Sequence, residues 1–167
     1  MQSAKSALTP LPIHLRLSQR DCPTSGSEGE DMKSVPYAPA VGSLMYTLVA
    51  TRPDISHAVG VISRFMHNPG RSHWNAVKHV FRYLAGTKDH DILFGLNSTS
   101  GVVGYTDSDF SGLGHHNASK HFEVRYHFVR DCVISEKIGL EKISTIDNVE
   151  DGMTKCLSAD RFRSLRQ

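Results

Sequence analysis

The sequence has few cysteines, no long apolar run and almost no net charge. Its three cysteines, Cys22, Cys132 and Cys156, are widely spaced and form no CxxC pair. This argues against a disulfide framework and favours a reducing compartment, either the cytoplasm or the nucleus. No apolar run approaches the roughly 20 residues that a membrane-spanning helix needs, so we expect no membrane partner. The formal net charge of +2 does not by itself demand a nucleic-acid partner.

Hydrophobic periodicity predicts three helices between residues 35 and 88. In residues 36–50, 51–70 and 72–86, apolar side chains recur at the spacing of one helix face. The stripe on the third helix comprises Trp74, Val77, Phe81 and Leu84. Residues 1–34 include a polar stretch rich in glycine, serine and acids, which predicts a linker or extended segment.

Residues 89–167 have a different character, in which short β-rich runs alternate with helical patterns. Strands are expected at 91–96, 101–107 and 138–145, and helices at 121–134 and 148–165. The expected fold class is therefore α/β, with a helical region at 35–88 followed by a mixed sheet within 89–167.

Two aspartates, Asp107 and Asp109, follow the apolar run GVVGYT. On a strand, a spacing of two places both carboxylates on one face. Such a pair is either part of a divalent-metal site or a solvated strand end.

The spacing of His116, His121, His127 and Cys132, by five, six and five positions, offers a zinc site as a further hypothesis. On a helix, His121 and His127 lie about 120° apart, and His127 and Cys132 about 140° apart. These side chains do not share a face, so surface histidines are the preferred interpretation.

A basic strip is predicted on the third helix, where Lys78 and Arg82 lie beside the apolar face with Arg71 nearby. The strip could follow the phosphates of a nucleic acid, with weak and salt-sensitive affinity. The alternative is an ordinary solvated helix face.

Several motifs resemble one family in one order along nearly the whole chain. The run VPYAPAVGSLMYTLVATRPDISHAVGVISRFMHNPGRSHWNAVKHVFRYLAGT resembles the segment that follows the polymerase palm in copia-type retrotransposon Pol polyproteins. GYTDSDFSG resembles the first ribonuclease H strand of that family. SKHFEVRYHFVRD and EDGMTKCL are similar to its later motifs, and TPLPIHLRLS to the sequence before the connection.

The resemblance implies a reverse transcriptase connection region followed by a ribonuclease H-like sheet that hydrolyses RNA in RNA–DNA hybrids. That fold holds two Mg²⁺ ions with four carboxylates. Asp107 matches the first catalytic aspartate of the family and Asp151 the last. Asp109 matches a common family acid that lies outside the inner shell.

The chain departs from the family after Gly112, where GLGH stands in place of further strands, a glutamate-bearing helix and a strand ending in "DN". These elements need on the order of 60 residues. We therefore expect a truncated ribonuclease H-like region at 89–167 that is catalytically defective. Two alternatives are a nucleic-acid-binding remnant that contacts an RNA–DNA hybrid, and an interaction fragment that docks on intact Pol.

Overall fold

The structure is a computed structural model that describes residues 5–24, 26–90, 103–106 and 120–166. It divides into two units. The first comprises Met1–Gly104 together with Val149–Gln167, and the second comprises Tyr105–Asn148.

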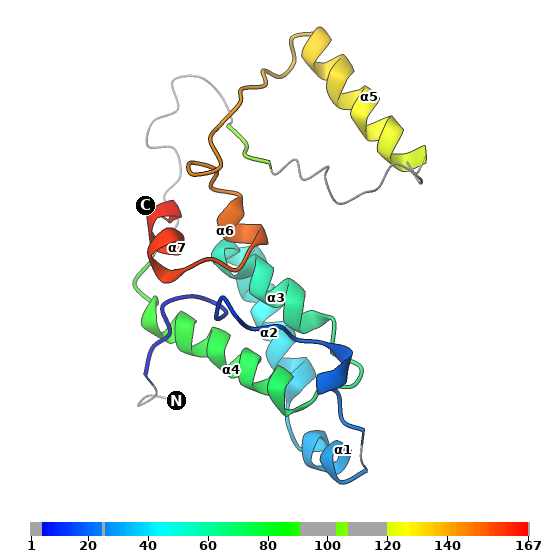
Figure 1. The fold of residues 1–167 in the computed structure, drawn as a ribbon, viewed down its shortest axis with the longest axis vertical. Coiled ribbons are helices and arrows are strands. Elements are labelled where there is room, and N and C mark those ends of the chain that lie inside the picture. The colour runs from blue at the N-terminus through cyan, green and yellow to red at the C-terminus, as the bar shows by residue number, and fades with distance from the viewer. Residues whose placement is uncertain (1–4, 25, 91–102, 107–119, 167) are drawn as a thin grey trace. The chain divides into compact units, whose positions relative to one another are not determined.

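The first unit is helical (Figure 1). Its α-helices are α1 (Gly26–Lys33), α2 (Tyr37–Ala50), α3 (Ser56–Ser63), α4 (Arg71–Gly86), α6 (Asp151–Thr154) and α7 (Ala159–Leu165). Two short 3-10 helices, η1 (Gln19–Asp21) and η2 (Pro53–Ile55), precede α1 and α3. The three predicted helices of residues 35–88 are confirmed, although the second begins as η2 and its α-helical part ends at Ser63.

Helices α2, α3 and α4 pack against one another and enclose the core of the unit. Each has buried apolar residues at helical spacing, because one stripe of each helix faces its neighbours. The fully buried members include Val41, Leu44, Ile62, Val77 and Val80.

The buried face of α4 differs from the predicted stripe. It comprises His73, Ala76, Val77, Val80 and Tyr83, whereas Trp74, Phe81 and Leu84 are only partly buried. The polar groups of His73 and Tyr83 can occupy this face because each has a hydrogen-bond partner. His73 Nδ1 accepts a hydrogen bond from the Gly70 N–H at 2.8 Å, which satisfies a donor at the helix start.

Two further segments complete the first unit. The N-terminal segment lies along α4, where the Ala7 N–H donates to the carbonyl of Arg82 at 3.4 Å. Figure 1 shows α6 and α7, in orange and red, beside this helical core. Phe162 of α7 is buried, with its ring edge-on to Tyr83 at a centroid distance of 5.9 Å.

The second unit contains the predicted helix, α5 (Lys120–Ile134). After α5 the chain has no regular structure until α6, and the Asn148 side chain donates to the carbonyl of Thr106 at 3.4 Å.

The predicted mixed α/β fold is wrong for the part of the chain that the structure describes, because no strand occurs there. Residues 138–145, an expected strand, form an exposed and irregular segment, as do residues 103–106. A β-rich run becomes a strand only when neighbouring strands take its backbone hydrogen bonds, and in the part of the chain that the structure describes no strand lies beside these residues. Residues 91–96 lie outside the described ranges.

None of the helices described is long and apolar enough to cross a membrane.

Candidate functional site

Asp151, predicted as a metal ligand, lies at the first residue of α6. Asp151 is only 5% exposed, and its carboxylate accepts a hydrogen bond from Lys155 Nζ at 2.9 Å. Helix α6 is held on α3, where the Ser56 hydroxyl donates to the carbonyl of Met153 at 2.8 Å. Asp151 therefore lies in packed structure and already has a cationic partner within its own segment.

The other predicted metal ligands, Asp107 and Asp109, lie outside the described residues. Within the described ranges, no group of three or more His, Cys, Asp and Glu side chains could hold a metal ion.

The basic strip predicted on α4 is not uniformly accessible. Arg71 is exposed and lies 3.6 Å from Asp31, while Lys78 and Arg82 are half-buried. The guanidinium of Arg82 contacts His79 Nδ1 at 3.2 Å. Since a guanidinium can only donate, His79 Nδ1 accepts and its Nε2 donates to the carbonyl of Thr9 at 3.1 Å. The structure thus engages Arg82 in the contact between α4 and the N-terminal segment.

A cluster of charged groups around Tyr83 was not foreseen from the sequence. Asp54 accepts two hydrogen bonds from Arg52, at 3.0 and 2.8 Å, and one from the Tyr83 hydroxyl. The Tyr83 hydroxyl in turn accepts from Arg166 Nη1 at 2.8 Å. Arg52 also donates to Thr87, at 2.7 Å to its hydroxyl. The cluster connects η2, α4 and the end of α7.

The electrostatics of the cluster follow from burial and pairing. Burial raises the pKa of Tyr83 to about 12, and its hydrogen bond to the Asp54 carboxylate acts in the same direction. Burial alone would also raise the pKa of Asp54, but the hydrogen bonds from Arg52 and Tyr83 outweigh it and lower that pKa. Tyr83 therefore stays protonated and Asp54 stays ionised near neutral pH.

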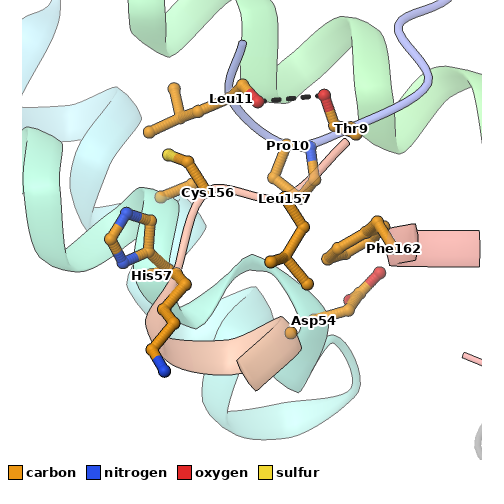
Figure 2. Close-up of a pocket in the computed structure, with 11 residues that line it drawn as sticks. Thr9, Pro10, Leu11, Asp54, His57, Cys156, Leu157 and Phe162 are labelled. Atoms are coloured by element: carbon orange, nitrogen blue, oxygen red, sulfur yellow. Dashed lines mark hydrogen bonds between the residues drawn. The ribbon is translucent and has the colours of Figure 1, made fainter. Parts of the chain in front are cut away.

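A small pocket lies next to this cluster (Figure 2). Asp54, His57, Cys156 and Phe162 contribute to its wall. The N-terminal segment lines one side, where the Thr9 hydroxyl donates to the carbonyl of Leu11 at 2.9 Å. Its volume of about 10 Å³ is roughly the space of one water molecule, too small for a substrate. Burial raises the pKa of the Cys156 thiol, which disfavours the thiolate that a nucleophile needs.

A wider, open depression of about 680 Å³ lies between the segment at 18–24 and the end of α3. Arg64, Phe65 and His67 are among its lining residues, and none of the lining residues is a carboxylate. It therefore provides no acid pair for metal-dependent hydrolysis.

The chain is similar in sequence to several known proteins. The chain is 33% identical to the "Retrovirus-related Pol polyprotein from transposon TNT 1-94" of Nicotiana tabacum, over 248 positions that take in 100% of the chain and 19% of that relative. It is 39% identical to the Pol polyprotein from transposon RE2 of Arabidopsis thaliana, over 71% of the chain and 9% of the relative. These homologues indicate a segment of a retrotransposon Pol polyprotein.

The chain thus spans about a fifth or less of the length of these two polyproteins. Over 48% of its length it is also 48% identical to "Secreted RxLR effector protein 161" of Plasmopara viticola, of which the match takes in 57%. No protein-family model matches the chain, and no solved structure matches it.

Proposed function

We propose that this Pol segment derives from the junction of reverse transcriptase and ribonuclease H and does not hydrolyse RNA–DNA hybrids. The motif resemblance supports the location. The alignment with the TNT 1-94 polyprotein supports the defect, because it runs over 248 positions and the chain has 167 residues. The difference, 81 positions, has no residue of this chain opposite it. This number of unmatched positions is sufficient for the catalytic elements that the sequence lacks after Gly112.

The environment of Asp151 is the observation that carries the proposal. Mg²⁺ needs near-octahedral oxygen coordination and keeps several waters, so a ligating carboxylate must face an open, hydrated site. Asp151 is instead buried, and the ammonium of Lys155 is 2.9 Å from its Oδ1. A cation at that oxygen would have to displace Lys155. The described residues around Asp151 therefore do not fit a magnesium site. We assign to Asp151 a structural role, in which its ion pair with Lys155 connects the start of α6 to the residue that follows the helix.

Cleavage of a labelled RNA–DNA hybrid in the presence of Mg²⁺ or Mn²⁺ tests the proposal. The wild-type chain and the Asp107→Asn variant are both expected to leave the hybrid intact, because two of four carboxylates cannot position both metal ions. Folding of each sample is checked by circular dichroism. Cleavage by the wild-type chain that disappears in Asp107→Asn would refute the proposal.

An Asp151→Asn variant separates the structural role of Asp151 from a catalytic one. It removes the charge opposite Lys155 while keeping the shape of the side chain. We expect a loss of unfolding free energy with no change in cleavage. A stability equal to that of the wild type would contradict the structural role.

A further inference from the structure

Helix α2 presents an apolar face that no described part of the chain covers. Its 14 residues include no charged side chain. Tyr37, Val41 and Leu44 are buried on the inner side, facing the core. A second, exposed side, which we call the outer face of α2, comprises Ala38, Gly42, Met45, Tyr46 and Val49.

Large side chains on this outer face are in contact with solvent. Met45 is 46% exposed, Tyr46 78% and Val49 86%. These residues recur at the spacing of one helix face, so they form one contiguous patch. Scattered exposed apolar residues are ordinary, but a contiguous patch on an uncharged helix indicates a surface that becomes covered.

The polar side chains of α2 support the same conclusion. The Ser43 hydroxyl donates to the carbonyl of Pro39 at 3.0 Å, and the Thr47 hydroxyl to the carbonyl of Ser43 at 2.9 Å. Both hydroxyl protons are thus bonded within the helix. Covering the helix would leave neither donor without an acceptor.

We propose that the outer face of α2 is an interface between two copies of this chain, with the two α2 helices packed antiparallel about a twofold axis. Size complementarity favours this occupant. Gly42 and Tyr46 are four residues apart, about 6 Å along the helix. An axis midway between them places Tyr46 of each copy over Gly42 of the other, and Val49 over Ala38 and its neighbours. A Cβ added at Gly42 meets nothing within 4 Å, so there is open space to receive a partner's ring.

Charge and area determine the strength of this association. A twofold axis brings the same surface of the two copies together, and the absence of charged residues on α2 removes the repulsion that like charges would cause. The three large side chains leave roughly 400 Å² exposed, so a pair with its small residues would bury on the order of 1,000 Å² in total. This lies at the lower limit for specific interfaces. The pair is therefore a monomer–dimer equilibrium that depends on concentration.

Sedimentation velocity of the full chain, from about 1 to several hundred micromolar, measures this equilibrium. The most specific test is the Gly42→Leu variant, whose added side chain fills the space that Tyr46 of the other copy would occupy. Gly60→Leu is the matched control, because Gly60 is also an exposed helical glycine with nothing within 4 Å of an added Cβ. Leucine is the better helix former, so neither substitution should lower the thermal stability of the monomer.

We expect the wild-type chain and Gly60→Leu to dimerise as concentration rises, and Gly42→Leu to associate at least tenfold more weakly. A wild-type chain that stays monomeric over the whole range would overturn the proposal. Dimerisation of Gly42→Leu with wild-type affinity would also overturn it, because the dimer would then use another surface. Neither result depends on hybrid cleavage, so this inference is independent of the proposed function.

Discussion

Substituting Tyr83 with phenylalanine removes one hydroxyl from the centre of the charged cluster and keeps the buried ring. The hydroxyl donates to Asp54 and accepts from Arg166. A hydrogen bond to a charged group contributes about 1.5–3 kcal/mol. Asp54 is 18% exposed and keeps both bonds from Arg52, while Arg166 is half-buried and can turn to water. We therefore count the full contribution of one hydrogen bond to a charged group, and expect Tyr83→Phe to lower the free energy of unfolding by about 2 kcal/mol.

Tyr37→Phe provides the matched control. The Tyr37 ring is also buried, but its hydroxyl donates to a neutral group, the carbonyl of Ile62, at 2.8 Å. A neutral hydrogen bond contributes about 1 kcal/mol. The two substitutions remove the same atom from similar surroundings, so their difference, about 1 kcal/mol, measures the charge of the Tyr83 partners.

Urea unfolding at pH 7, followed by far-ultraviolet circular dichroism, measures both variants. The reasoning requires Tyr83→Phe to be the more destabilising of the two with an unchanged dependence on urea concentration. If Tyr83→Phe costs no more than Tyr37→Phe, the cluster does not stabilise the closure of α7 over α4 and our account of it is wrong.

Two further predictions concern pH and a glycine. Burial lowers the pKa of three histidines below 6.5 in the folded protein, namely His57, His73 and His79. As the pH falls from 7.5 to 5.5, the unfolded chain therefore binds more protons than the folded protein, and the free energy of unfolding should fall. The pKa of Asp54 is lowered from 3.8, so its contribution is lost only below that pH, and equal stability at 5.5 and 7.5 would refute the assignment to histidines. Gly70→Ala should lower the free energy of unfolding in urea by about 1–3 kcal/mol, because its Cβ would overlap the carbonyl oxygen of Asp21. Gly60→Ala, in open space, should stabilise the chain, and a Gly70→Ala chain as stable as the wild type would contradict the close approach.

Periodicity was sufficient to predict the helices whose apolar stripes lie against one another. It predicted α2 and α5 closely. It misplaced the buried face of α4, because the pattern counts only apolar residues and the structure buries His73 and Tyr83 through specific partners. One helix was expected over residues 148–165, where the structure has α6 and α7. The signal for this break was present in Ser158, whose hydroxyl accepts from the Arg161 N–H as an N-cap.

Two differences between the prediction and the described structure, the lack of a sheet and the presence of the charged cluster, have different reasons. Residues 138–145 include the apolar residues Ile138, Leu140 and Ile143, but a strand depends on partners elsewhere in the chain. The cluster joins Tyr83 to Arg166, which are 83 residues apart, and neither residue lies in a local motif that predicts their contact. Asp151 was identified by resemblance, which says nothing of its burial or of Lys155.

The discontinuous first unit has a consequence for how the chain is made. Arg166 and Phe162 reach the ribosome exit long after Tyr83, and at 5–20 residues per second the delay is roughly 4 to 17 seconds. During that interval Asp54 and Tyr83 have only part of their final partners, and the apolar surface that Phe162 covers is open. Until Phe162 is made, the nascent helices therefore expose an apolar surface that chaperones can bind. A ribosome that terminates before residue 149 releases a chain without Phe162 and Arg166, in which the apolar surface that Phe162 covers stays exposed.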